Sequence, residues 1–365
     1  MADTLGTNYG EKYGRNSLKL YFQSAISPKI TNKKWEGQIK GGRGDRVNVL
    51  TYGINAWEDY TGSDITFNDV SEVEGTLILE KQRNNSFRIK DWDRFKSYAT
   101  DVESTELTSV AELLKQEIDA YNLGFYDEAG NIVGTDYTTG TIAVVTGTGA
   151  VTGSGTTFTS AMVGKPFTIA GVEGVFKVLS QSSATAIVIC DQDDEANYSG
   201  GTVSAGTNYV VEGNAVLTVD DTDIDDAILL AKEKLDRKGV NGDFCPKKNR
   251  FLVVPSKVES ILLKSNLLTP YTPSAYEDVV KLGIIGMYRG FKVYVSEEVT
   301  GDNTTGFHCL AGHEMGITHA FVQIASENVR LENNFGKGLK QLIAYGSKVL
   351  DARRKCLCDV FIKVS

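Results

Sequence analysis

The sequence predicts an α+β protein whose core is interrupted by a small all-β domain. Strand-like and helix-like segments are interleaved through the second half of the chain, which favours an α+β core over a doubly wound sheet. A long amphipathic helix is predicted near residues 92–121. Between residues 134 and 213 the composition changes abruptly to Gly, Thr, Ser and Val, in short alternating runs typical of a small sandwich or barrel.

Length and composition indicate a folded protein with more than one domain. A chain of 365 residues can bury a sizeable core, and its 41% hydrophobic and 23% charged residues are ordinary globular values. No apolar run is long enough to cross a bilayer, so no membrane partner is expected. Five dispersed cysteines fit reduced thiols, and the net charge of −9 disfavours a generic nucleic-acid-binding domain.

The first 35 residues are predicted to form an extended arm with at most a short helix near Leu18–Ala25. Residues 1–50 carry nine basic and four acidic side chains, so this end of an acidic protein is basic. The charge is either simply solvated or faces a polyanion or an acidic neighbouring subunit. The candidate arm residues are Lys12, Arg15, Lys19, Lys29, Lys33 and Lys34.

A long β-hairpin is predicted next, from the strand-like runs RVNVLTYGI, ITFNDV and EGTLILEKQRNNSFRI. A two-stranded ribbon is marginal in water because it buries little apolar surface. No later segment is an obvious partner in the sequence. The ribbon is therefore expected to pack either on its own domain or, as the sharper hypothesis, on a neighbouring subunit.

Two helices have clear apolar faces. In the long helix the face is Leu107, Val110, Leu114, Ile118 and Tyr121, and Asn122 and Gly124 are suitable stop residues. A second helix follows the β insert, with basic residues near its end that favour the helix dipole. Its predicted buried face is Ile224, Ala227, Ile228, Ala231 and Leu235, and Lys232, Lys234, Arg237 and Lys238 are its basic residues. Strand RFLVVPS, helix SKVESILLKSNLL and a half-buried strand from Phe291 come next.

No catalytic, cofactor or metal site is predicted. His313 and His319 lie six residues apart, which does not match the four-residue spacing of a zinc-protease helix. His308 has no evident partner, and Cys356 and Cys358 lack a second ligand pair at zinc spacing. The glycines between residues 147 and 155 match no phosphate-binding loop. The chain is expected not to be an enzyme.

The order of these segments resembles the major capsid proteins of tailed bacteriophages with the Hong Kong 97 type fold. The most specific pieces are ITFNDV with TLILEKQ, then RFLVVPS, GMYRGFKVYVSEEV and NVRLENNFGKGLKQLIAYGSKVL. The last contains Arg330, Phe335, Tyr345 and Gly346 in the order expected for that family. The resemblance covers nearly all of the chain outside the insert.

This resemblance implies six regions. They are an N-terminal arm (1–35), an extended loop (36–91), a peripheral domain with a spine helix (92–133), an inserted β domain (134–213), an axial domain (214–325) and C-terminal strands returning to the peripheral domain (326–365). In this family the loop lies over the adjacent subunit, which would support the thin ribbon. The candidate intersubunit contacts are Trp57, Asp59, Tyr60, Lys81 and Arg83.

The resemblance also implies the function and partners. The chain is expected to assemble into pentamers and hexamers of an icosahedral head around double-stranded DNA, with the arm facing the DNA without sequence specificity. A separate scaffolding protein, a portal and a cement protein are the other expected partners, and assembly in the host bacterial cytoplasm is expected to leave the protein in the virion. The insert would brace the capsomer or face outwards.

Two alternatives stay open. An encapsulin-like compartment would share the fold but enclose cargo proteins in place of DNA. A tail-associated adhesion protein would use the β insert to bind carbohydrate and would form small discrete oligomers.

Overall fold

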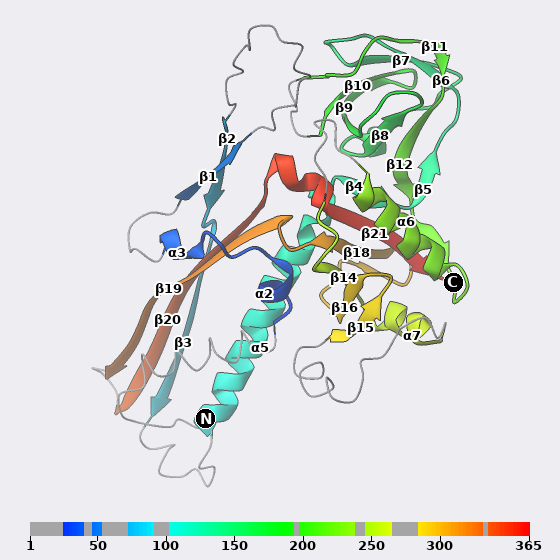
Figure 1. The fold of residues 1–365 in the computed structure, drawn as a ribbon. Helices are drawn as coiled ribbons and strands as arrows, with labels where there is room; N and C mark the ends of the chain where they lie inside the picture. The colour runs from blue at the N-terminus through cyan, green and yellow to red at the C-terminus, as the bar shows by residue number, and fades with distance from the viewer. Residues whose placement is uncertain are drawn as a thin grey trace, which may run out of the picture.

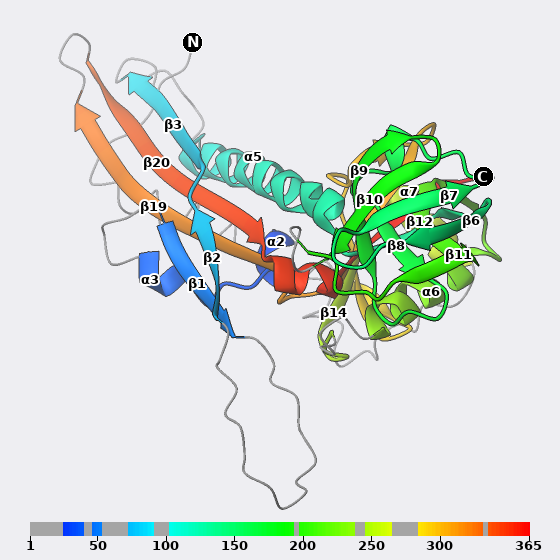
Figure 2. The same ribbon diagram turned by 90° about the horizontal axis from the view of Figure 1, so that it is seen from above.

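The computed structural model describes residues 25–39, 46–52, 72–90, 102–192, 197–237, 245–264, 284–330 and 335–365. These residues form three regions: a central sheet with helices against it, a curled β domain, and a narrow peripheral sheet beside a long helix (Figures 1 and 2). The α+β class and the all-β insert are as the sequence predicts.

The central sheet is mixed and has the order β13-β21-β18-β14-β16-β15, with β4 beside β21 and β17 beside β18. Helix α6 (Ile224–Asp236) packs against β21 and β4, and α7 (Ser256–Lys264) follows β14. The predicted apolar face of α6 is confirmed, because all five of its residues are buried in the central core. The strands are β4 (Asn131–Val133), β13 (Leu217–Val219), β14 (Arg250–Val254), β15 (Ile284–Tyr288), β16 (Phe291–Val295), β17 (Gly301–Asp302), β18 (Gly306–His313) and β21 (Leu357–Val364).

Strand β16 differs from its prediction as a half-buried strand. It pairs with β14 on one side and β15 on the other, and Phe291, Val293 and Tyr294 are all buried. An interior strand covered on both faces does not need strict alternation of apolar and polar residues. The turn into β16 is Arg289-Gly290, with φ of 48° and 95°, which is the positive-φ pair that a two-residue hairpin favours.

The inserted domain is one curled antiparallel sheet of order β11-β6-β7-β10-β9-β8-β12-β5. Its residues span 135–215, close to the predicted 134–213, and its apolar side chains form a core of their own around Phe167 and Phe176. The strands are β5 (Thr135–Tyr137), β6 (Thr141–Val144), β7 (Ala150–Ser154), β8 (Pro166–Ile169), β9 (Phe176–Ser183), β10 (Ala186–Asp191), β11 (Val203–Thr207) and β12 (Tyr209–Ala215), with the short helix η2 (Ser160–Met162) before β8.

The peripheral sheet has the order β19-β20-β3 and lies beside α5 (Val102–Leu123), which continues into η1 (Gly124–Glu128) (Figure 2). Leu114 and Ile118 of α5 pack on Phe321, Ile343 and Tyr345 of the sheet. The strands are β3 (Lys81–Lys90), β19 (Ile317–Arg330) and β20 (Gly336–Val349). Strands β1 (Arg46–Tyr52) and β2 (Glu72–Ile78) form a separate ribbon, and α2 (Ser27–Ile30), α3 (Glu36–Ile39) and η4 (Asp351–Cys356) complete the described elements.

Two boundaries implied by the resemblance are wrong. Within residues 326–365, the end of β19 and all of β20 do lie in the peripheral sheet, but β21 lies between β13 and β18 in the central sheet. The apolar run of β21 suits a position with both faces covered. The expected limit at residue 325 also falls inside β19, which begins at Ile317, and β4 of the expected peripheral segment pairs with β21.

Candidate assembly interface

The ribbon of β1 and β2 is anchored on its own chain at its base. Val47, Val49 and Leu77 pack with Ala320 and Leu350 in a small apolar cluster. Strand β3 continues from the ribbon into the peripheral sheet and pairs with β20 along its length. Of the two alternatives for the hairpin, packing on its own chain therefore holds for residues 46–52 and 72–90.

Two glycines allow this close approach. A Cβ on Gly75 would lie 2.5 Å from Leu350 Cδ2, and a Cβ on Gly346 would lie 2.1 Å from the carbonyl oxygen of Ile78. Both distances are below van der Waals contact. A side chain at position 346 would push the ribbon off the sheet because it meets backbone, whereas a side chain at position 75 would require the end of the Leu350 side chain to move. Gly346, which the resemblance singled out, has a direct packing role.

Lys81 and Arg83, two candidate intersubunit residues on β3, both contact the spine helix of the same chain. The Lys81 ammonium lies 5.9 Å from the ring centroid of Tyr121. Arg83 forms an ion pair with Glu117, which also accepts a hydrogen bond of 2.9 Å from the Tyr345 hydroxyl. Half of the Arg83 side chain remains exposed. These contacts hold β3 against α5.

The described part of the basic arm crosses the peripheral region. The buried carboxylate of Asp119 accepts hydrogen bonds from the backbone N–H groups of Ile26 (3.1 Å) and Ser27 (2.8 Å). Asn32 forms a bridge beside Thr318 at the start of β19, through backbone bonds to Ile317 and His319. The arm is thereby tied to α5 and β19.

Asp119 is a site that sequence reasoning missed. It lies within the long helix next to Ile118 of the predicted apolar face, and burial raises the pKa of its carboxyl group. The sequence did contain a signal for this site, because Asp119 is an acidic residue next to Ile118, which was predicted to be buried.

The basic arm residues differ in environment. Lys29 is half-buried near Asp119, and burial lowers the pKa of its ammonium group. Lys33 lies near the buried His319, and exposed Lys34 lies 5.6 Å from the ring centroid of Trp35. The candidate residues Lys12, Arg15, Lys19, Trp57, Asp59 and Tyr60, and most of the predicted helix Leu18–Ala25, lie outside the described residues.

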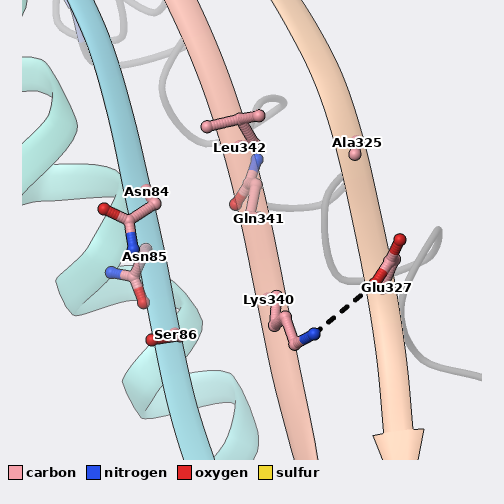
Figure 3. Close-up of a pocket in the computed structure, with 8 residues that line it drawn as sticks. All are labelled: Asn84, Asn85, Ser86, Ala325, Glu327, Lys340, Gln341 and Leu342. Carbon is pink, nitrogen blue, oxygen red and sulfur yellow. Dashed lines mark ion pairs between the residues drawn. The ribbon is translucent and has the colours of Figure 1, made fainter.

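A shallow groove of about 330 Å³ crosses the three strands of the peripheral sheet (Figure 3). Leu342 pairs with Ala325 and Asn84, and Lys340 pairs with Glu327 and Ser86, so these side chains share one face. Because Ile343 and Tyr345 pack on α5, alternation places the groove on the opposite face.

The groove is mixed in character. Lys340 and Glu327 form an exposed ion pair of 3.7 Å at one end, while Leu342 and Ala325 supply an apolar floor (Figure 3). Polar Asn84 and Ser86 complete the wall formed by β3. A surface with an apolar floor and a polar rim is typical of a protein contact.

The β domain is fastened to the central sheet by a buried ion cluster. Lys234 is 2% exposed, pairs with Glu212 of β12 at 3.0 Å and donates to the Ile132 carbonyl at 2.7 Å. Arg237 pairs with the same carboxylate, and Asp136 lies 3.9 Å from Lys234. Lys234 lies in the last turn of α6, as predicted, and its ammonium group also joins two domains, which the sequence did not indicate.

His308, for which the sequence shows no evident partner, has one in the central region. Its Nδ1 lies 2.8 Å from Asp359, and its ring is stacked between Tyr126 and Phe361 at centroid distances of 4.0 and 4.1 Å. Burial raises the pKa of the Asp359 carboxyl group. The pair lies at the side of the sheet near Lys165 of the β domain.

His319 belongs to a second buried polar group. Its Nδ1 lies 2.8 Å from the Ser347 hydroxyl, which donates to the Asn122 side chain. Because the hydroxyl proton is used there, Nδ1 of His319 carries the proton and donates. Burial lowers the pKa of His319 to about 3, so its ring is neutral near pH 7.

Within the described ranges, no group of His, Cys, Asp and Glu side chains could hold a metal ion. No helix among the described residues is long and apolar enough to span a membrane.

Comparisons with known proteins identify the fold. No family model matches the sequence, and no curated protein matches it. A structure from Mycobacterium phage Che8 is similar over 98% of this chain and 94% of the phage chain, with a TM-score of 0.51 and 16% sequence identity. The capsid of cyanophage P-SCSP1u covers 94% and 89%, with a TM-score of 0.51 and 12% identity.

The mature capsid of bacteriophage PhiM1 is also similar, covering 94% of this chain and 87% of its own, with a TM-score of 0.50 and 10% identity. Identities this low show a common fold and nothing finer. The similarity to these structures extends over almost the whole chain. The chain therefore has the Hong Kong 97 type fold of tailed-phage capsid proteins.

Proposed function

We propose that the protein is a major capsid protein that assembles into pentamers and hexamers of an icosahedral phage head around double-stranded DNA. The observation that carries this proposal is the similarity of fold to phage capsid structures over 94% of the chain. The role is structural and not enzymatic, with the protein in the virion after assembly in the host cytoplasm. A scaffolding protein, a portal and a cement protein are the other proposed partners.

Assembly follows from repeated heterologous contacts. Copies that meet through different patches close into rings of five or six, and many weak contacts per subunit stabilise the whole shell. We propose that the loop joining β1 to β2, with Trp57, Asp59 and Tyr60, contacts a neighbouring subunit. Lys81 and Arg83 remain candidate contacts because they lie on the same extended segment, and Arg83 is half exposed.

The groove on the peripheral sheet is the proposed receiving surface. It lies on the face away from α5 and combines an apolar floor with an ion pair. The loop sequence GINAWEDYTGSDITFNDV offers aromatic and acidic side chains that suit such a surface. The basic arm would face the packaged DNA through non-specific phosphate contacts.

Deleting about residues 52–69 tests the loop. The central and peripheral regions should stay folded by circular dichroism, because the ribbon base keeps its own cluster. Large particles should disappear from light scattering and negative-stain microscopy. If shells still form without the loop, the proposal that the loop contacts a neighbouring subunit is contradicted.

A point variant tests the groove. Leu342→Glu places a charge on the apolar floor and should block shell formation while leaving the melting temperature nearly unchanged. Leu179→Glu, at an exposed position of β9 in the insert, is the matched control and should assemble. If the two variants assemble equally well, the groove is not part of the interface between subunits.

Nucleic acid in native particles tests the proposed cargo. Nuclease-protected double-stranded DNA inside the particles is expected, whereas particles that enclose only protein would favour an encapsulin-like compartment. The scaffolding partner is tested separately, because purified chain that reaches uniform shells unaided would contradict it.

A further inference from the structure

Lys234 of α6 lies between two carboxylates of the β domain. Its Nζ is 3.0 Å from Oε2 of Glu212 on β12 and 3.9 Å from Oδ1 of Asp136 on β5. The side chains of Lys234 and Glu212 are almost completely buried, whereas one third of the Asp136 side chain is exposed. An amine, a carboxyl group and a second carboxylate at one buried place are the two reactants and the proton acceptor for an amide bond.

The hydrogen bonds that such an amide needs are already formed. Nζ of Lys234 donates to the carbonyl oxygen of Ile132 at 2.7 Å. Oδ1 of Asp136 accepts a hydrogen bond of 2.8 Å from the backbone N–H of Gly213. An amide between Nζ and the Asp136 carboxyl carbon would keep both partners. The Gly213 N–H would also stabilise the negative charge that develops on Oδ1 during attack.

Glu212 is placed to accept the proton that Lys234 has to lose. Its Oε1 pairs with Arg237. Its Oε2 lies 3.0 Å from Nζ and has no hydrogen-bond partner among the described residues. A carboxylate at this distance can act as a general base. Arg237 orients that carboxylate by holding its other oxygen.

The balance of charge favours Asp136 over Glu212 as the reacting carboxyl group. The cluster contains two cations, Lys234 and Arg237, and two carboxylates. Condensation of Lys234 with Asp136 removes one charge of each sign and leaves the pair of Arg237 and Glu212 intact. A link to Glu212 would instead remove the carboxylate that Arg237 contacts. Because a buried ion carries a desolvation penalty, its replacement by a neutral amide relieves that penalty.

We propose that Lys234 and Asp136 condense into an isopeptide bond, an amide between two side chains, once the chain has folded. Glu212 takes a proton from the Lys234 ammonium group, and the free amine attacks the carboxyl carbon of Asp136. The C–N bond forms and one C–O bond of the carboxyl group breaks. That oxygen leaves as water with the two protons that the ammonium group has lost. Nothing is oxidised or reduced, and Glu212 ends as a carboxylate.

The exposure of Asp136 supplies the movement that the reaction needs. Attack requires the amine roughly 3–3.5 Å from the carboxyl carbon, a distance that a small rotation of the Asp136 side chain supplies. The part of this side chain that is exposed leaves room for that rotation. The water that is formed can leave by the same exposed side.

A second pair of lysine and aspartate provides a contrast. Lys247 lies 3.7 Å from Asp236, but 79% of the Lys247 side chain is exposed. Water solvates that ammonium group, and no second carboxylate pairs with it among the described residues. Proximity alone is therefore not expected to produce an amide there.

The bond would link α6 of the central region to β5, close to the point where the chain enters the β domain. Thr135, next to Asp136, also donates to the carbonyl oxygen of Val216 at the exit of that domain. The isopeptide bond would hold the β domain in one orientation on the central sheet. This inference concerns the isolated chain and does not depend on the proposed shell function.

Mass spectrometry of the purified full-length chain tests the proposal. The denatured wild-type chain is expected to be lighter than its sequence mass by one water. Digestion should yield one branched peptide that joins Lys234 to Asp136, and none that joins Lys247 to Asp236. The link should survive mild alkali, which opens the cyclic imides that aspartate also forms by losing water.

Variants identify the reacting groups. Asp136→Asn should still form the amide, but the chain should lose ammonia in place of water. Glu212→Gln removes the proton acceptor with little change of shape, and the link should form more slowly by roughly 100-fold or more. Lys247→Ala is the control and should form the link as the wild type does.

The wild-type mass decides the question even if a variant fails to fold. The proposal is overturned if the folded wild-type chain keeps its full mass after prolonged incubation. It is also overturned if the lost water maps to other residues, or if the link joins Lys234 to Glu212.

Discussion

The central and peripheral regions of this chain differ in how they are held together. The central sheet buries a continuous core in which Phe251, Leu252 and Val253 are almost completely inaccessible. The peripheral sheet has three strands, one helix on one face, and two small apolar clusters. Its other face carries the exposed groove of Figure 3.

This difference suggests where stability and assembly reside. A thick core stabilises a domain by itself, whereas a thin sheet with one open face opens more easily and offers surface to a partner. The β domain follows the first pattern, since its curled sheet encloses its own core. We therefore expect mutations in the two regions to differ in how much stability they remove and in how far the loss spreads through the structure.

The largest effect is expected at the seam between the β domain and the central sheet. Lys234→Met removes the cation that Glu212 and the Ile132 carbonyl share, and breaking such a buried pair costs about 3–5 kcal/mol. The change in the free energy of unfolding is measured by denaturant titration. Lys232→Met, two residues earlier on the more exposed side of α6, should change stability little, and equal losses would contradict the buried cluster.

Two truncations compare the regions directly. Leu252→Ala in the central core and Ile343→Ala in the peripheral sheet each remove buried methyl groups, a change worth about 2–5 kcal/mol. We expect Leu252→Ala to cost close to the upper limit and to destabilise the whole central domain cooperatively, because Leu252 lies within its continuous apolar core. The second should be smaller and confined to β3, β19 and β20 by hydrogen exchange. A larger loss of stability for Ile343→Ala than for Leu252→Ala would contradict the expected difference between the two regions.

His319 makes the peripheral region sensitive to acid. Its pKa is about 3 in the folded chain and 6.5 when solvated, so below pH 6.5 the unfolded chain binds a proton that the folded chain does not. Stability is full above pH 6.5 and falls as the pH drops towards 3, by roughly 2 kcal/mol at pH 5. Unfolding free energies at pH 7.5 and 5 measure this. His319→Gln should flatten the dependence, and an unchanged slope would contradict it.

The smallest effect is expected for the arm. Asp119→Ala leaves the Ile26 and Ser27 amides without their acceptor, at about 1–3 kcal/mol. Faster hydrogen exchange at these two amides, with the central sheet unchanged, is the expected result. Glu112→Ala on the exposed side of α5 is the control. Exchange that spreads into β14 would mean that the two regions unfold together.

Periodic patterns were sufficient for the elements with strong local signals. The apolar spacing of α6, the strand RFLVV and the Gly and Thr-rich strands of the insert all predict what the structure contains. Local patterns failed where burial comes from elsewhere in the chain. Tyr294 and Lys234 each look like surface residues, and both are buried because other segments cover them.

The sequence by itself determined the fold class, the order of the elements and the main buried faces, because these follow from local spacing of apolar residues. Only the tertiary structure decided that the ribbon base rests on its own chain, that β21 enters the central sheet, and that Asp119 and His319 acquire their partners. These outcomes depend on contacts between residues tens to hundreds of positions apart. Sequence periodicity carries no information about such distances, whereas packing and hydrogen bonding in the folded chain determine them.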